Sequence, residues 1–242
     1  MNEILALLKD YGNKSVASSQ VLHPNALACG LSGGALERDP LASYLGQRGA
    51  VDCTIVRIDM ISPHLAYVQV AYPTKSGHRG EILGLIKVTR GWQLVSLLWG
   101  DNADAFSNLY PDRLNRQSGD AAALYDMLMR YCDAVYNLDA KAALALFFSE
   151  DIPMEHPVAG GEMAYVPISV LHDRWHDLEH PSKSGIGQFS RIFHVEMINA
   201  DTAFAKLGVS KLHDHYNDYI SCIKLDGRWL IVNKMTELLM QK

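Results

Sequence analysis

The sequence predicts an α+β protein made of two tandem units, each with helices packed on a curved antiparallel sheet. Three observations predict this fold class. The chain repeats itself at an offset of 137 residues, so that TIVRIDMISPHLAYVQV lies over RIFHVEMINADTAFAKL. In the second copy, helical periodicity comes first and strand alternation follows it. The 242 residues, 48% of them hydrophobic, suit one large domain or two small ones.

Identical residues carry the repeat along an ungapped stretch. The pairs include Ile55 with Ile192, Met60 with Met197, His78 with His215, Ile86 with Ile223 and Trp92 with Trp229. Upstream, GGALERDPLASYL lies over GGEMAYVPISVLH, and the dipeptide at 23–24 lies over that at 156–157. We therefore expect a truncated first repeat over 1–110, a linker over 111–117 and a complete second repeat over 118–242. The first copy begins near ILALL and so lacks a long first helix.

The helices of the second copy are predicted by apolar spacing. Leu124, Leu128, Tyr131 and Val135 recur every three or four residues, which is typical of one face of a helix, and Asp120 is its expected N-cap. A second helix is expected over AKAALALFF, with the residue at 139 as its cap. A short third helix follows the proline at 167 and contains HDRWHDLEH.

The strands come after Gly187, where the pattern changes to alternation. Phe189, Phe193 and Val195 are expected on one strand face. Three more strands are predicted over TAFAKLGVS, NDYISCIKL and RWLIVNKM, the last two joined by a tight Asp-Gly turn at 226–227. The first copy closes in the same way, with GEILGLIKV and GWQLVSLLW.

Composition excludes several classes of function. The net charge of −5 is spread over interspersed acids and bases, so no basic stripe indicates nucleic-acid binding. No apolar run approaches the ~20 residues of a membrane span, and the N-terminus is a poor secretory signal. The four cysteines have no CxxC spacing, which favours free and mostly buried thiols in a cytoplasmic protein.

The second half resembles a known superfamily. MRYCDAVYNLDAKAALALFFSEDIPMEHPVAG resembles the opening of steroid delta-isomerases of the nuclear transport factor 2-like superfamily, and DYISCIKLDGRWLIVNK resembles the close of its putative lumazine-binding branch. The resemblance implies two cystatin-like cones in tandem, with a long helix closing over a bent sheet and one pocket in each complete copy. It specifies a fold more than a reaction, because this scaffold hosts isomerases, dehydratases, cyclases and non-catalytic binders.

Three positions carry over from the isomerases. Tyr131 stands where their tyrosine donates a hydrogen bond to the enolate oxygen, His156 stands at the general base, and Ser221 maps near the second oxyanion donor. A histidine is a serviceable base at neutral pH, and a tyrosine in an apolar pocket is a strong donor to an oxyanion. The alternatives are a structural His156 before Pro157 and a core Tyr131 with a satisfied hydroxyl.

HDRWHDLEH places histidines at 172, 176 and 180, at the spacing of a zinc helix. A zinc site needs three or four converging ligands, and no further ligand run marks itself. We therefore expect no metal and a solvated helix face with Trp175 turned inward. Trp175, His194, Tyr219 and Ser221 are the expected pocket-lining residues, the last two because they share a strand face. Asp218 is expected to be solvated near a strand start.

These patterns leave three functions open. The first is a binding protein for an apolar ring compound in the conical pocket of the second repeat. The second is an isomerase, dehydratase or cyclase that moves a proton with His156 as base and Tyr131 as oxyanion donor; none of these reactions needs a cofactor, and none is expected. The third is an assembly module, in which the two sheets pack back to back as an intrachain pseudo-dimer. The identity of the ligand and a further homodimer are left open.

Overall fold

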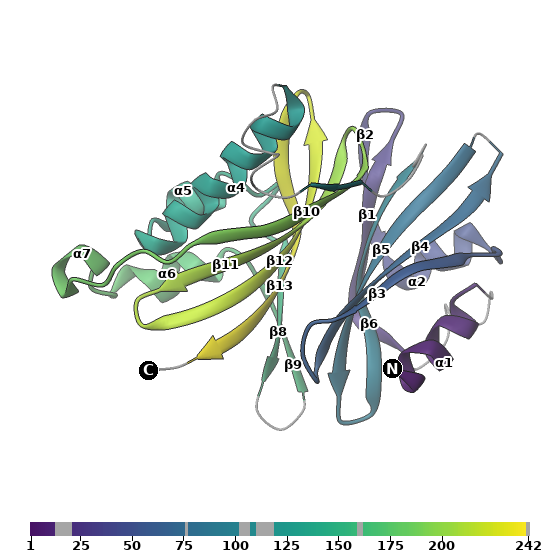
Figure 1. Ribbon diagram of the computed structural model, residues 1–242, viewed down its shortest axis with the longest axis horizontal. Helices are drawn as coiled ribbons and strands as arrows, with labels where there is room; N and C mark the ends of the chain where they lie inside the picture. The colour runs from purple at the N-terminus through teal and green to yellow at the C-terminus, as the bar shows by residue number, and fades with distance from the viewer. Residues whose placement is uncertain (13–20, 76, 102–106, 110–118, 159–161, 241–242) are drawn as a thin grey trace. The chain divides into compact units, whose positions relative to one another are not determined.

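The computed structural model describes residues 1–12, 21–75, 77–101, 107–109, 119–158 and 162–240 (Figure 1). The chain divides into two compact units, Met1–Phe106 with Pro157–Ala164, and Ser107–His156 with Tyr165–Lys242. The predicted linker over 111–117 lies outside the described residues, and the predicted boundaries at 110 and 118 stay predictions. Each unit has helices on a sheet, which confirms the α+β class and its two-fold repetition.

The first unit holds a six-stranded sheet in the order β2-β1-β6-β5-β4-β3, with β1 and β6 parallel and the other pairs antiparallel. Its elements are α1 (Asn2–Tyr11), β1 (Leu22–Ser32), β2 (Ala35–Pro40), α2 (Leu41–Arg48), β3 (Thr54–Met60), β4 (Leu65–Thr74), β5 (Gly77–Val88) and β6 (Gly91–Asp101). The helix α1 has only ten residues, so the described residues of this unit contain no long first helix, as predicted.

The second unit holds a seven-stranded sheet in the order β7-β10-β11-β12-β13-β8-β9. Its elements are β7 (Ser107–Leu109), α4 (Asp120–Tyr136), α5 (Ala140–Leu144), β8 (Pro153–Val158), β9 (Glu162–Pro167), α6 (Val170–His176), α7 (Pro181–Ser184), β10 (Arg191–Asn199), β11 (Thr202–Lys211), β12 (Asp214–Leu225) and β13 (Arg228–Met240). The seventeen-residue α4 is the predicted long helix, and β13 pairs with β8 in parallel.

Caps and turns agree with the sequence at two of three predicted places. The Asp139 side chain accepts from the backbone N–H of Ala142 and caps α5. Asp226 and Gly227 both have positive φ, which a tight hairpin turn of this kind requires. Asp120, however, does not cap α4: it is the first helical residue, and its carboxylate binds Lys224 Nζ at 2.7 Å.

Two helices are shorter than the sequence patterns predict. The helix α5 ends at Leu144, because Phe147 leaves it to form a bridge with Ile231 of β13. The helix α6 ends at His176, so His180 of HDRWHDLEH lies beyond it.

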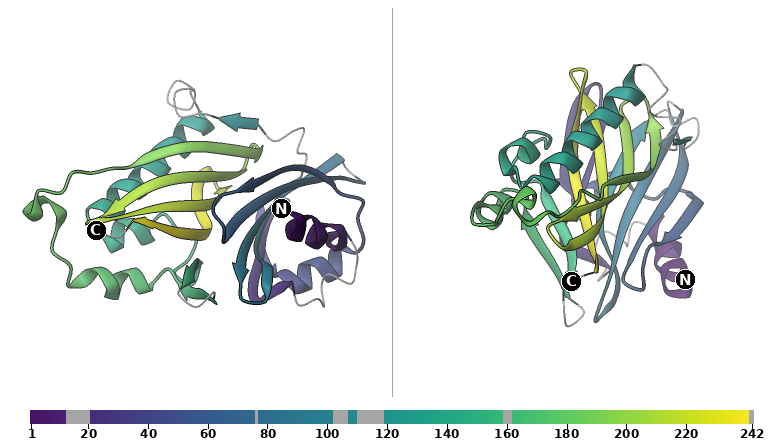
Figure 2. Two further views of the ribbon diagram at one scale, coloured as in Figure 1. Left: turned by 60° about the horizontal axis from the view of Figure 1, so that its bottom comes forward. Right: turned by 60° about the vertical axis from the view of Figure 1, so that its left-hand side comes forward.

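The core of the second unit lies between α4 and one face of β10–β13, and α4 runs along that face in both views of Figure 2. We call this the inner face and the opposite one the outer face. Side chains of α4 pack there on strand residues such as Ala205, Leu207, Ile220 and Cys222. None of the helices in the described ranges is long and apolar enough to cross a membrane.

Candidate functional site

A buried carboxylate lies at the centre of the second unit. Asp218, on β12, accepts a hydrogen bond from the Tyr131 hydroxyl at 2.6 Å and one from the Thr236 hydroxyl at 2.8 Å. Lys234 Nζ lies 3.0 Å from the same oxygen that Tyr131 binds. All four residues are buried. A closed polar network therefore links α4 to β12 and β13, and the prediction of a solvated Asp218 was wrong.

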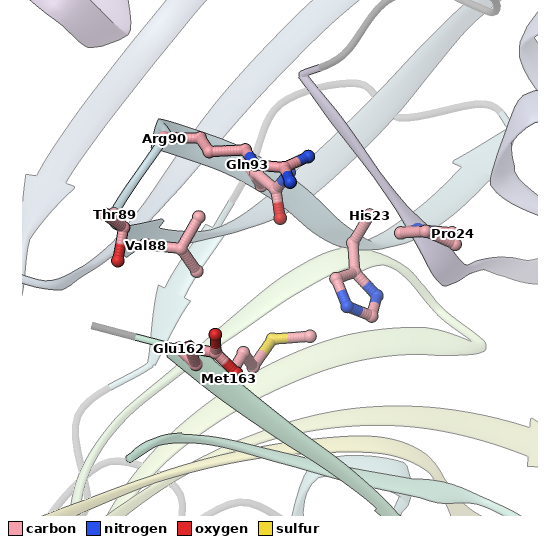
Figure 3. A pocket seen from close by; sticks show the side chains of 8 residues that line it. All are labelled: His23, Pro24, Val88, Thr89, Arg90, Gln93, Glu162 and Met163. Atoms are coloured by element: carbon pink, nitrogen blue, oxygen red, sulfur yellow. The ribbon is translucent and has the colours of Figure 1, made fainter. Parts of the chain in front are cut away.

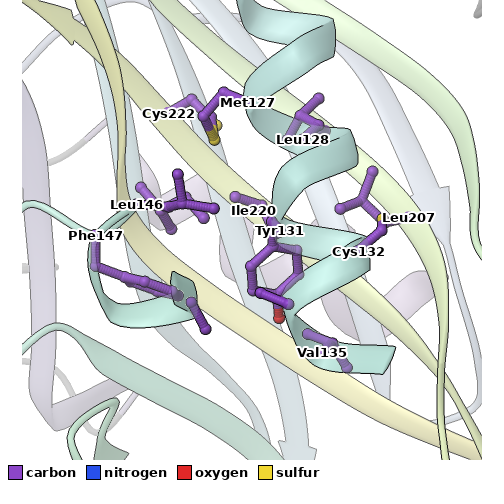
Figure 4. Close-up of a cluster of buried hydrophobic side chains, with 14 of the residues drawn as sticks. Met127, Leu128, Tyr131, Cys132, Val135, Leu146, Phe147, Leu207, Ile220 and Cys222 are labelled. Carbon is purple, nitrogen blue, oxygen red and sulfur yellow. The ribbon is translucent and has the colours of Figure 1, made fainter. Parts of the chain in front are cut away.

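The hydroxyl of Tyr131 is already hydrogen-bonded within this network. This ring lies among the apolar side chains of the core, edge-on to Phe147 (Figure 4). Burial first, and then the charge of Asp218, raises the pKa of Tyr131 well above its usual value. The hydroxyl thus stays protonated and donates to Asp218, which leaves Tyr131 itself with no proton to donate to the oxygen of a ligand.

His156 faces the same side of the sheet. In β8, Met154 pairs with Lys234, so His156 two residues later shares the inner face with it. The imidazole is half-buried and makes no hydrogen bond to another described residue. Burial, followed by the charges of Arg174 and Lys234, lowers its pKa from 6.5. His156 is therefore neutral at pH 7 and has a free ring nitrogen.

Further polar groups surround this part of the inner face. Lys211, at the end of β11, has Nζ 5.3 Å from the centre of the Tyr216 ring, and the Tyr216 hydroxyl donates to Asp214 at 2.9 Å. Arg174, on α6, is exposed, and its charge acts to lower the pKa of His156, Lys211 and Tyr216. We call the following six residues the polar cluster: His156, Arg174, Lys211, Tyr216, Asp218 and Lys234.

Three predicted pocket residues lie on the other face. Tyr219 and Ser221 alternate with Asp218 and Ile220 along β12, so they share the outer face. His194 pairs with Lys206, which pairs in turn with Tyr219, and so it also faces outward. These three residues therefore do not face Tyr131 and His156.

Trp175 is buried in the core of the second unit and turned inward, as predicted. The histidines on either side of it, His172 and His176, are exposed. They border a surface hollow of about 340 Å³ together with His180. Among the described residues no group of three or more metal-ligating side chains comes together.

The first unit has a buried acid at the equivalent position. Glu81, on β5, stands 137 residues before Asp218 and accepts from the hydroxyls of Tyr11, Tyr44 and Tyr72. Arg48 adds an ion pair at 3.0 Å. Tyr11, at the end of α1, thus does for Glu81 what Tyr131 does for Asp218, although the sequence predicted that this copy lacks the long first helix. Four donors close the network of the first unit.

His23, the counterpart of His156, has a local structural role. Its Nδ1 accepts from the backbone N–H of Asn25 at 3.2 Å. It borders a shallow hollow of about 260 Å³, shown in Figure 3, whose lining residues all fall within the compact unit formed by Met1–Phe106 and Pro157–Ala164. The other lining residues are Pro24, Val88, Thr89, Arg90, Gln93, Glu162 and Met163.

The sequence contained one unused signal for the polar cluster. In the ungapped alignment of the repeats, Glu81 falls on Asp218 within otherwise apolar strands. An acid kept at the same place in both copies of a duplicated strand indicates a shared buried acceptor.

Comparison with known families agrees with this geometry. Residues 119–236 match the family described as putative lumazine-binding. The matched stretch makes up just under half of the chain. The match confirms the resemblance to the putative lumazine-binding family that the closing motif of this half predicts.

Solved structures resemble about half of the chain. An NTF2-like protein of unknown function from Shewanella baltica OS155 is 18% identical, with 50% of this chain and 94% of that one covered and a TM-score of 0.44. An NTF2-like protein of unknown function from Methylobacillus flagellatus KT is 27% identical. The match covers 50% of this chain and 93% of that one, with a TM-score of 0.41. A ketosteroid isomerase-like protein from Erwinia carotovora atroseptica SCRI1043 is 16% identical. The match covers 52% of this chain and 100% of that one, with a TM-score of 0.38. No curated protein matches the sequence.

Proposed function

We propose that the second unit binds a small ring compound at the polar cluster and does not transform it. The observation that carries the proposal is that half-buried side chains from β8, β11 and β12 share the inner face with the buried network of Asp218. Small-molecule sites of this kind combine an apolar wall with a few placed polar groups. The name of the matched family supports a flat heterocycle such as lumazine as the ligand.

Binding is favoured over catalysis by the state of Tyr131. Proton transfer next to a carbonyl needs a donor aimed at the developing oxyanion. The Tyr131 hydroxyl is engaged with Asp218, and Asp218 accepts from three groups and so supplies no proton of its own. His156 alone keeps the chemistry of a base, because its imidazole is neutral and free.

The first experiment is native mass spectrometry of the purified full-length chain, which reports any copurified small molecule. The second is a calorimetric titration with lumazine. We expect His156→Ala to weaken binding about tenfold, the effect of one lost polar contact. His194→Ala is the matched control, because this histidine lies on the outer face, and it should leave the affinity unchanged. Equal losses in both variants would contradict a site on the inner face.

Catalysis is tested separately. A steroid with a β,γ-unsaturated ketone is incubated with the protein, and the absorbance of the conjugated product is followed. We expect no turnover above background. Turnover that disappears in His156→Ala would favour the isomerase over the binding protein.

We also propose that the two units pack through their outer faces as an intrachain pseudo-dimer. In the second unit Phe204, Tyr219 and Met235 share the outer face, and in the first unit Tyr67 and Ile82 lie on the face away from α1 and α2. Sheets with apolar residues on both faces need a cover on each. Small-angle scattering should give a radius of gyration of about 18 Å for such a compact chain. A much larger radius of gyration would show that the two units do not pack together, which would contradict the pseudo-dimer.

The four cysteines are free, and three of them are buried. This state supports a reducing compartment, and we propose the cytoplasm as the location. Expression of a fluorescent fusion in the source cell, followed by fractionation, tests it.

A further inference from the structure

The sheets of the two units differ at one edge. The strands β3 and β10 are equivalent in the repeats, because Thr54 lies over Arg191 at the offset of 137 residues. In the second unit, β7 pairs antiparallel with the side of β10 that faces away from β11. In the first unit, β3 is the last strand of its sheet, and no strand in the described ranges pairs with the side that faces away from β4. Such an edge offers a row of backbone N–H and C=O groups to another chain.

The second unit shows that a strand can pair at this place. The residues of β10 that pair with β7 are 195–197, and the equivalent stretch of β3 is 58–60. Both strands carry a bulge at the same position, within 55–57 in β3 and within 192–194 in β10. A bulge often protects an edge by twisting it away, yet β10 is paired directly beyond its bulge. The backbone of β3 is therefore suited to the same kind of pairing.

The side chains along this part of β3 are apolar at both ends and charged between them. Val56 is 49% exposed and Met60 is 40% exposed. Arg57 and Asp59 form an ion pair at 2.7 Å. These two residues are two positions apart beyond the bulge, so they lie on the same face of the sheet. The edge thus presents one positive and one negative group side by side.

This pattern is complementary to itself. When two copies of β3 pair antiparallel with Ile58 opposite its own copy, Arg57 lies opposite Asp59 of the second copy. The two-fold symmetry makes the same pair a second time. Val56 then lies opposite Met60 of the second copy. Opposite charges across antiparallel strands stabilise the pairing, and like charges destabilise it. The order of the charges therefore favours a second copy of this chain over an unrelated strand.

We propose that two copies of this chain associate through the edges of β3, so that the sheets of their first units become continuous. The pairing is antiparallel and two-fold symmetric, with Ile58 at its centre. The dimer is weak, because a few residues of a strand edge bury less surface than a stable interface needs. It uses no residue of the polar cluster and is independent of ligand binding.

Analytical ultracentrifugation of the full-length chain at low salt, from about 5 to 500 µM, measures the association. We expect a reversible equilibrium of monomer and dimer in this range. Arg57→Asp and Asp59→Arg should each weaken the dimer about tenfold, because every dimer then contains two pairs of like charges. A chain that sediments as a monomer at every concentration would overturn the proposal. The scattering measurement of the single chain is accordingly made on dilute protein.

A mixture of the two variants tests the arrangement of the strands. One variant carries acids at both positions and the other carries bases at both, so an equimolar mixture should form heterodimers about as tight as the wild-type dimer. Both variants lack the ion pair within β3, so mixing could not restore a merely structural role of that pair. No recovery in the mixture would contradict the pairing of Arg57 with Asp59 of the second copy.

Glu37→Arg is the matched control. Glu37 is exposed on β2, the opposite edge of the same sheet, and the substitution changes the charge as much as Asp59→Arg does. It should leave the dimer unchanged, and an equal weakening would show that net charge and not the edge of β3 explains the effect. Hydrogen exchange at the two ends of the concentration range locates the contact in the unaltered chain. We expect exchange at high concentration to slow in β3 and not in β2, and the reverse would overturn the proposal.

Discussion

Glu81 and Asp218 are buried acids at equivalent positions of the two repeats, and each accepts a hydrogen bond from a tyrosine on the first helix of its own unit. Their surroundings differ. Glu81 is enclosed by three tyrosine hydroxyls and by Arg48 from α2. Asp218 takes its cation from β13 instead, because the residue aligned with Arg48 is the buried Trp175. The equivalent acid is thus enclosed by donors in the first unit, whereas in the second unit it shares a face with half-buried polar side chains.

Removal of the Asp218 carboxylate should destabilise the second unit strongly. Asp218→Ala leaves Lys234 buried without its counter-charge, a change that costs about 3–5 kcal/mol in the free energy of unfolding. Urea unfolding measures the loss, and hydrogen exchange of β12 locates it. Asp126→Ala on the exposed side of α4 should change stability by less than about 0.5 kcal/mol. Adding Lys234→Met to Asp218→Ala should restore part of the loss, and no recovery would contradict the ion pair.

The tyrosines should differ between the repeats. Tyr131→Phe removes one of three donors to Asp218 and should cost about 1–3 kcal/mol, as for a hydrogen bond to a charged group. Tyr11→Phe should cost less, because Glu81 keeps Tyr44, Tyr72 and Arg48. The comparison of the two variants in urea is the measurement. A larger loss for Tyr11 would show that the first network is not redundant.

His156 should make stability depend on pH. Burial and the charges of Arg174 and Lys234 lower its folded-state pKa below 6.5, so between the two values the unfolded chain binds the proton more readily. Its contribution is therefore complete above about pH 6.5 and is lost as the pH falls through the folded-state pKa. His156→Gln should flatten the stability profile between pH 7.5 and 5. If an NMR titration of the His156 imidazole gave a midpoint above 6.5, protonation would stabilise the folded state, and the predicted dependence of stability on pH would be contradicted.

The buried thiols should be unreactive in the native protein. Burial raises the pKa of Cys132 to about 12 and that of Cys222 further, so neither carries appreciable thiolate at pH 8. Cys53 is half-buried and is expected to react first with Ellman's reagent. The count of reactive thiols should rise to four in guanidinium. Rapid native reaction of Cys132 would indicate local opening of α4.

Local patterns were sufficient for the secondary structure of the second unit. The spacing of Leu124, Leu128 and Tyr131 predicts α4, and the Asp-Gly pair at 226–227 predicts the last hairpin turn. For β10, the sequence pattern gave the wrong division of residues between the two faces of the strand. A bulge between Ile192 and His194 breaks the alternation of β10, so Ile192 and Val195 both enter the core although they are three residues apart.

By itself the sequence determined that the chain is a duplicated α+β protein, because repeats and periodicity are written in local residue order. The resemblance of its second half also predicted a shared site for His156 and Tyr131, and this stays a prediction. Only the tertiary structure decided what they do. Alternation divides β12 into two faces, but the contact of Tyr131 with Asp218, 87 residues away, establishes which face α4 covers. That choice turned Tyr219 and Ser221 outward and placed Lys211 and His156 on the inner face, because long-range strand pairing and not local order sets the faces.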